Sequence, residues 1–429
     1  MKTTRRDFLA TAALAGGSAA LLPLSARAAT STRRPDYTPL DLALKQPVLK
    51  REYFPAPVII ETLELLRDRD NFICRVRSKD GAEGISLGHP FISKQGYPLF
   101  THALQRQFIG QDARDLDHLI YLATERNVKI QGVPLCVQIA TIEFAILDLL
   151  GNLARRPVRE LIGDLLHPEI SIYLGHLLSE MRRLPPEESL VLLAKDQRET
   201  QAKALKLRAG RGDNLASDID NAPGRTEKLI RLAREKFGPA MTLMIDGNGS
   251  YSVQEAIRIG RILEEQKYYF YEEPLPWDWY EDQKIVADTL AIKMAGGEEE
   301  FSLRNFRWLI AHDAFDILQP DLFYFGGMIR TMQVARMAAV AGKTIAPHMS
   351  GGGLGYVYLM NFVPSCPNAE RFHEFKMSET TDANGTLVPI QSKGEPFTCV
   401  DGILKAPTGT GLGLTIDPAY VRTHRPVAV

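Results

Sequence analysis

The sequence predicts a parallel β/α barrel that follows a smaller α+β domain. In the second half of the chain, short β-prone runs alternate with amphipathic helical stretches, and strand–helix alternation of this kind favours a parallel sheet. Eight such runs within about 210 residues favour closure of the sheet into a barrel. The eight predicted strands are residues 170–174, 204–208, 241–245, 268–272, 292–295, 315–319, 343–347 and 371–375.

The part of the chain before the barrel has a different pattern. Residues 57–64 and 71–76 alternate like strands of a small antiparallel sheet. A broad apolar face over residues 137–153 predicts a long, largely buried helix. The final fifty residues return to turns and short strands, and we expect them to pack back on this first domain. The expected divisions are 1–28 (export signal), 29–168 (α+β capping domain), 169–377 (barrel) and 378–429 (C-terminal segment).

The N-terminus has the three parts of a twin-arginine export signal in order. Arg5 and Arg6 precede Asp7-Phe8-Leu9, an apolar stretch runs to Leu24, and the small-residue site Ala26-Arg27-Ala28 follows. Glycine, serine and proline interrupt the apolar stretch, so a membrane-spanning helix is not expected. The sequence therefore predicts cleavage after Ala28, a periplasmic location and no membrane anchor.

Composition excludes some partners. The chain has 51 Lys and Arg against 52 Asp and Glu, a formal net charge of -1. A balanced charge gives no electrostatic reason to expect binding to nucleic acid or to an anionic membrane surface. The four cysteines lie far apart without a C-x-x-C spacing, which favours buried thiols over disulfides or a zinc site.

Three acidic residues stand where predicted barrel strands end. Asp246, Glu272 and Glu298 are separated by two equal gaps of 26 residues (246 to 272 and 272 to 298). The C-terminal ends of barrel strands face one site, so these carboxylates would converge there and repel one another unless a cation lay between them. Oxygen ligands favour a hard ion, and Mg²⁺ is the natural candidate. One such acid alone would be better explained as a solvated turn or helix cap.

Two other strand ends carry groups suited to proton transfer. Asp321 ends Leu-Gln-Pro-Asp, and His348 ends Ile-Ala-Pro-His on the next strand. A carboxylate beside an imidazole fixes its tautomer and raises its basicity, as a general base requires. Earlier, Lys206 and Arg208 lie two residues apart on one strand, so both side chains point the same way. If both side chains point into the mouth of the barrel, they could bind a substrate carboxylate.

Taken together, these residues resemble the mandelate racemase and muconate lactonizing enzyme branch of the enolase superfamily. The ordered set is Lys-x-Arg, Asp-x-Asn, Glu-Glu-Pro, Gly-Glu, Asp and His, with the helix Ile142–Asp148 before it and Gly-Leu-Gly near the C-terminus. The resemblance implies a (β/α)7β modified TIM barrel, with a capping domain completed by the C-terminal segment. It also implies one Mg²⁺ per subunit on Asp246, Glu272 and Glu298, catalysis by Asp321–His348, and a homo-oligomer.

The resemblance further implies that Lys206 contacts the substrate carboxylate and that Asn248 adds a hydrogen bond. It implies that an acid on the eighth strand, protonated to stabilise an enolate oxygen, is Glu374, with Glu370 as the alternative. Substrate specificity is expected in capping-domain loops, including residues 88–97.

Arg208 departs from the family pattern, which has a second lysine there. Arginine stays protonated near neutral pH and is a poor base, so two-base racemisation loses support and one-base chemistry by His348 gains it. The function expected is dehydration of an aldonic or aldaric sugar acid to a 2-keto-3-deoxy acid. The alternatives are a racemase or epimerase, a cycloisomerase, and a periplasmic sugar-acid binder with a decayed site.

Overall fold

The computed structural model describes residues 35–175, 183–350, 354–376 and 381–428. The chain divides after residue 35, and all the described helices and strands belong to the second unit, residues 36–429. The predicted export signal, residues 1–28, lies outside the described residues.

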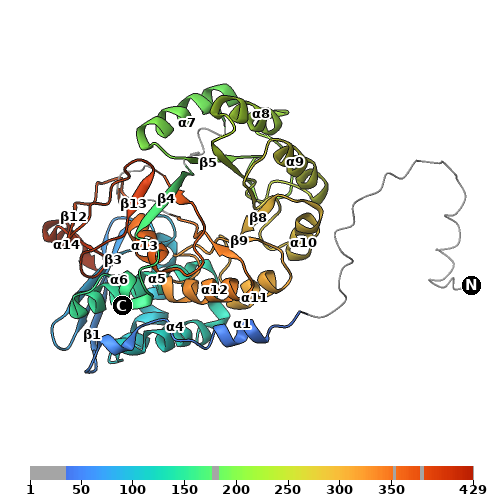
Figure 1. Cartoon of the computed structure of the whole chain (residues 1–429). Helices are drawn as coiled ribbons and strands as arrows, with labels where there is room; N and C mark the ends of the chain where they lie inside the picture. Colours follow the sequence, from blue (N-terminus) through green and yellow to red (C-terminus); the bar gives the residue numbers. More distant parts are fainter. Residues whose placement is uncertain (1–34, 176–182, 351–353, 377–380, 429) are drawn as a thin grey trace, which may run out of the picture. The chain divides into compact units, whose positions relative to one another are not determined.

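Eight parallel strands form the centre of the second unit (Figure 1). In order around the sheet they are β10 (Thr344–Ile345), β9 (Ile317–Leu318), β8 (Lys293–Gly296), β7 (Phe270–Glu272), β6 (Thr242–Asp246), β5 (Ala204–Arg208), β4 (Glu169–Leu174) and β11 (His373–Phe375). A parallel bridge between Ile345, in β10, and Ala369, just before β11, joins the two edges of the sheet. The ring is therefore closed, and the predicted barrel is confirmed.

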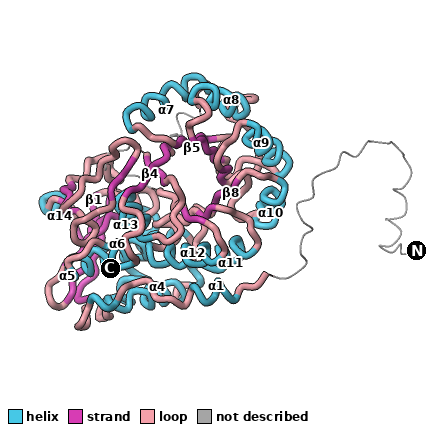
Figure 2. The backbone as a smooth tube through the Cα atoms, viewed as in Figure 1, coloured by secondary structure: helices cyan, strands magenta, loops and turns pink. Residues whose placement is uncertain are grey.

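A helix follows each strand except the last and lies outside the ring, as Figure 2 shows. These helices are α7 (Pro186–Thr200), α8 (Arg225–Phe237), α9 (Val253–Glu265), α10 (Tyr280–Thr289), α11 (Leu303–Ala311), α12 (Met328–Val340) and α13 (Gly355–Phe362). Seven strand–helix pairs and a final strand make the (β/α)7β arrangement that the resemblance implied. Ser252 and Ser302 begin α9 and α11 by accepting backbone N–H bonds of the first turn, which are otherwise unsatisfied.

Inside the ring, one buried residue from or beside each strand fills the barrel. They are Tyr173, Ala204, Met244, Phe270, Ala295, Ile317, Ala346 and Phe372, none more than 4% exposed. A barrel interior packed in this way is a core and not a channel. It supports the polar side chains that stand one or more residues further along, at the C-terminal ends of the strands.

Before the barrel lies a four-stranded antiparallel sheet in the order β15-β1-β2-β3. Its strands are β1 (Ile60–Asp68), β2 (Asn71–Ser78), β3 (Glu83–Leu87) and β15 (Arg425–Pro426). The sequence predicted only the first two. Helix α5 (Val133–Ala154) packs on this sheet so closely that a Cβ at Gly84 would lie 2.1 Å from the carbonyl oxygen of Ala145. The shorter helices of this region are α1 (Thr38–Ala43), α2 (Ser93–Pro98), α3 (Gln105–Phe108), α4 (Leu116–Glu125) and α6 (Val158–Ile162).

Within the described residues, α5 is the one helix that is long and apolar enough to cross a membrane by those criteria alone. Its most apolar window is 89% buried inside the protein. A buried core helix of a folded domain passes the same test of length and composition.

The C-terminal segment contributes β12 (Ile390–Ser392), β13 (Ile403–Lys405), β14 (Leu414–Ile416) and α14 (Pro418–Thr423) before β15. β15 adds an edge to the first sheet by pairing with β1, as expected. The segment also contacts the barrel, because β13 pairs antiparallel with β4. The exact domain divisions given above stay a prediction. All four cysteines are unpaired, and all but Cys399 are buried.

Candidate active site

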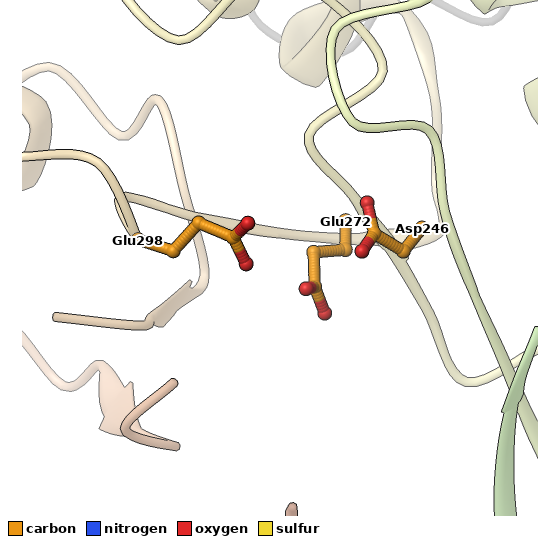
Figure 3. A group of neighbouring side chains, drawn as sticks. All are labelled: Asp246, Glu272 and Glu298. Atoms are coloured by element: carbon orange, nitrogen blue, oxygen red, sulfur yellow. The ribbon is translucent and has the colours of Figure 1, made fainter. Parts of the chain in front are cut away.

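Three carboxylates meet at the C-terminal ends of β6, β7 and β8. Asp246 and Glu272 are the last residues of their strands, and Glu298 follows β8 by two residues. One oxygen from each lies within 4.8 Å of the other two, and Figure 3 shows the Glu298 carboxylate extending toward the other pair. The side chains are 0%, 0% and 6% exposed. Burial and the neighbouring Asp246 and Glu298 charges raise the pKa of Glu272 to about 8, although Lys206 opposes this.

This cluster has the donor set of a hard divalent cation. All its ligand atoms are carboxylate oxygens, and Oε2 of Glu298 is buried with no hydrogen-bond partner among the described residues. A cation between the carboxylates would relieve both their repulsion and the unsatisfied oxygen. The residues present therefore fit such an ion.

The backbone next to the cluster is strained. Asn248, two residues after Asp246, has φ 41°, and Glu273, directly after Glu272, has φ 34°. Non-glycine residues seldom adopt this left-handed region, and such positions gather at functional sites. The carboxylate of Glu273 accepts the backbone N–H groups of Gly297 and Glu298, at 2.9 and 3.2 Å. It thereby fixes the loop that carries Glu298.

Lys206 and Arg208 both face the cluster from β5. Nζ of Lys206 lies 2.5 Å from Oε1 of Glu272, and Nη1 of Arg208 donates to both Asp246 and Asn248. Burial alone would lower the pKa of each group, but the surrounding carboxylates, Glu272 for Lys206 and Asp246 for Arg208, outweigh it and raise both pKa values. Arg208 is thus held as a cation, which does not suit a base.

Asp321 and His348 form the hydrogen-bonded pair expected from the sequence. Oδ2 of Asp321 lies 2.8 Å from Nδ1 of His348 and accepts the N–H of Ser350 at 2.7 Å. Its Oδ1 accepts the N–H groups of Phe323 and Tyr324. With four contacts the carboxylate cannot turn, so it fixes the orientation of the imidazole. Nε2 of His348 is left facing the centre of the site, 3.4 Å from Oε2 of Glu298.

Of the two acids considered for the eighth strand, Glu374 shares this site. Its carboxylate lies 3.8 Å from both Nζ of Lys206 and Nε2 of His348, and a Cβ at Gly175 would collide with it at 2.5 Å. Glu370 accepts instead from Tyr269 at 2.6 Å and from Thr344 at 2.7 Å. Tyr269 directly precedes β7 and Thr344 begins β10, so both lie at the N-terminal ends of their strands, away from the acidic cluster.

The expected protonated state of Glu374 does not agree with its surroundings. Burial alone would raise its pKa, but the charges of Lys376, Lys206 and His348 outweigh burial and hold the pKa well below the usual range. The acid is therefore ionised and accepts a hydrogen bond from the N–H of Met349 at 3.0 Å.

Several residues of the site were not identified from the sequence. Gln319 donates to Oε2 of Glu272 at 2.8 Å, and Lys376 lies 3.6 Å from Oε1 of Glu374. Each stands two residues from a predicted site residue, Asp321 or Glu374, so the two-residue period of a strand could have indicated both. His89, which packs against Tyr324 from the first domain, lies in the loop of residues 88–97 where specificity was expected, but no pattern in the sequence singled it out.

Comparison with known proteins agrees with this arrangement. The family described as enolase C-terminal domain-like matches residues 189–420. An arabinonate dehydratase of Saccharolobus solfataricus is 26% identical over 322 residues, 70% of this chain and 80% of the relative. An L-talarate/galactarate dehydratase of Salmonella typhimurium is 28% identical over 285 residues, 65% of this chain and 67% of the relative.

A solved structure from Paracoccus denitrificans PD1222, of a mandelate racemase/muconate lactonizing protein complexed with magnesium, superposes with a TM-score of 0.75 at 25% identity. The match covers 87% of this chain and 100% of that one. The protein is an enzyme that belongs to the enolase C-terminal domain-like family and, within the enolase superfamily, to the mandelate racemase and muconate lactonizing enzyme branch.

Proposed function

We propose that this enzyme is a magnesium-dependent dehydratase that converts a sugar acid to a 2-keto-3-deoxy acid. The observation that carries the proposal is the contrast between His348 and Arg208. His348 is oriented by Asp321, with Nε2 facing the centre of the site, whereas Arg208 is held as a cation on Asp246 and Asn248. His348 follows β10 and Arg208 ends β5, and these two strands are separated by β4 and β11 on one side of the ring and by four strands on the other. They therefore approach a substrate from different sides, and only one side carries a base.

Dehydration needs only one such base. His348 takes the proton from the carbon beside the carboxylate while Asp321 stabilises the imidazolium that forms. The same Nε2–H then gives that proton to the hydroxyl on the next carbon, and the C–O bond breaks with loss of water. The enol that remains tautomerises to the 2-keto-3-deoxy acid. Inversion of the α-carbon would require a proton donor on the opposite face, and a guanidinium is a poor acid and a poor base.

The charge that develops during proton removal is the main obstacle, because the substrate carboxylate is already negative. Lys206 would hold that carboxylate and offset part of the charge, and Asn248 would add a hydrogen bond. Asp246, Glu272 and Glu298 would hold Mg²⁺, which when bound supplies positive charge that offsets the remaining negative charge of the enolate. The support for magnesium is the buried all-oxygen cluster and the named complex of the Paracoccus protein.

The substrate class rests on the two named relatives, which are an arabinonate and an L-talarate/galactarate dehydratase. The direct test is to incubate the purified enzyme and Mg²⁺ with a library of aldonic and aldaric acids and to measure 2-keto acid with semicarbazide. We expect at least one acid to be dehydrated. Epimerised acids with no keto product across the whole library would favour the racemase or epimerase alternative.

We also propose that the protein is exported to the periplasm by the twin-arginine route. The support is the order Arg-Arg, apolar stretch and Ala-Arg-Ala in residues 1–28. This route carries folded proteins, so the metal site could be filled before export.

A further inference from the structure

Lys376 is a third cation at the mouth of the barrel, and it differs from the other two. It stands directly after β11, and its Nζ donates to the carbonyl oxygen of Met349 at 2.7 Å. Met349 is the residue after His348, so the ammonium lies beside the proposed base. The one ion pair that it forms among the described residues is with Glu374, at 3.6 Å. Two of its three N–H bonds therefore have no acceptor within the described part of the chain.

The two deeper cations lie against the acidic cluster instead. Lys206 is 1% exposed and bonded to Glu272, and Arg208 is bonded to Asp246 and Asn248. The side chain of Lys376 is 22% exposed. It is two residues further along its strand than Glu374, and therefore further from the barrel interior. A substrate whose reacting carboxylate lies at Lys206 would extend past His348 toward Lys376.

A second donor faces this region from the first domain. His89, in the loop between β3 and α2, is 1% exposed. Its Nδ1 accepts the backbone N–H groups of Phe91 and Ile92, both at 3.1 Å. Because Nδ1 is an acceptor, the ring proton must be on Nε2, and Nε2 is buried with no hydrogen-bond partner among the described residues. A buried donor without a partner is costly to a fold unless a ligand or water satisfies it.

The position of His89 links it to the reacting groups. Its ring lies 5.4 Å from that of Tyr324, which in turn lies 6.4 Å from the ring of His348. Burial, together with the charges of His348 and Lys376, lowers the pKa of His89 to about 4, while Asp321 opposes this. The imidazole is therefore a neutral donor that lies within electrostatic reach of the Asp321–His348 pair and of Lys376.

We propose that Lys376 and His89 together bind a second carboxylate at the far end of the substrate, so that the enzyme prefers aldaric acids, which carry a carboxylate at each end, to aldonic acids, which carry one. The partly exposed ammonium of Lys376, with two unused N–H donors, supplies positive charge, and the unpaired Nε2–H of His89 supplies a directional hydrogen bond. This inference rests on the proposed function and narrows its substrate class.

The test compares each aldaric acid with the aldonic acid of the same configuration, for wild type and for Lys376→Gln, Lys376→Arg and His89→Asn. The asparagine retains an acceptor for the loop amides and removes the distal donor. Lys293→Gln, a lysine at the opposite end of the barrel beside Glu370, is the matched control. We expect kcat/KM for the aldaric acid to fall about 100-fold in Lys376→Gln and about 10-fold in His89→Asn, mainly through KM. The fold-loss should be clearly smaller for the aldonic acid, which lacks the distal carboxylate, and both acids should change less than about threefold in Lys293→Gln. Lys376→Arg should recover most of the loss on the aldaric acid.

Equal losses on both acids in Lys376→Gln, or a wild type that prefers the aldonic partner, would overturn the proposal. The same comparison is made by calorimetry in the His348→Asn background, where binding is measured without turnover. In that background, tighter binding of diacids than of monoacids that is lost in Lys376→Gln supports the subsite whatever reaction the enzyme performs. Equal binding of the two kinds of acid refutes the subsite. Keto acid formation from aldonic acids alone would leave the dehydratase proposal standing and remove only the subsite.

Discussion

Glu143 offers a test of how burial acts on a charge at the junction between α5 and the barrel. Its side chain is fully buried on α5 and accepts the N–H groups of Met328, at 2.5 Å, and Ile329, at 3.2 Å, in the first turn of α12. The positive end of that helix favours the ionised carboxylate, but burial dominates and raises the pKa of Glu143 from 4.5 to about 8. The pocket is tight, because a Cβ at Gly327 would lie 2.3 Å from Oε2.

The sign of the effect follows from proton binding. Between pH 5 and pH 8 the folded state keeps a proton on Glu143 that the unfolded state has released, so its contribution to stability is complete at low pH and falls as pH rises through 8. A pKa difference of about 3.5 corresponds to about 5 kcal/mol in full, of which about 3–4 kcal/mol is lost between pH 5 and pH 8. Glu143→Gln keeps an acceptor for both N–H groups and cannot ionise.

The assay is urea denaturation of wild type and Glu143→Gln at several pH values from 5 to 8, with Glu125→Gln as control because Glu125 is exposed at the end of α4. The free energy of unfolding of the wild type should fall by about 3–4 kcal/mol relative to Glu143→Gln over this range. The Glu125 variant should follow the wild type. Parallel curves for wild type and Glu143→Gln would refute the reasoning.

The other predictions concern the site and the export signal. Removal of metal with EDTA should abolish turnover, and added Mg²⁺ should restore it. Mg²⁺ at 100 times its Kd should stabilise wild type against thermal unfolding by about 2.7 kcal/mol and should not stabilise Glu272→Gln. Full activity in the metal-stripped enzyme would contradict this prediction. Asp321→Asn should lose less activity than His348→Asn if the carboxylate only orients the ring, which stopped-flow assays of both variants would show. Mass spectrometry of the periplasmic fraction should find a mature chain that begins at residue 29, and export should fail in the Arg5→Lys, Arg6→Lys double variant; an intact N-terminus on exported protein would count against the signal.

The barrel could be predicted because each of its strands leaves a local signal. β5 begins and ends at the predicted residues, Ala204 and Arg208, since a buried parallel strand needs a short apolar run there. β9 and β10 are only two residues each, shorter at both ends than the predicted ranges 315–319 and 343–347. The equal spacing of strand–helix units also made the meeting of three acids predictable.

Contacts between elements far apart in sequence could not be predicted in this way. Glu143 and Asp148 look like polar positions of an amphipathic helix, yet both are buried and accept backbone N–H groups, those of Met328 and Ile329 for Glu143 and of Ile85 and Leu412 for Asp148. The position of His89 depends on how its loop packs on Phe323 and Tyr324. The ionised state of Glu374 depends on Lys376; the two-residue period puts the two on one face of the strand but does not give the effect of the ammonium on the carboxylate.

The claim that His348 is the one proton-abstracting base of a dehydratase is tested most directly in deuterated water. Wild type and His348→Asn are incubated with a substrate acid and Mg²⁺, and products are followed by NMR. We predict a 2-keto-3-deoxy product from wild type. In His348→Asn we predict loss of α-deuterium exchange, with a fall in rate of at least about 100- to 10,000-fold. Clean α-epimerisation without keto acid, or exchange that survives in His348→Asn, would contradict the account and assign a base to the other face of the substrate.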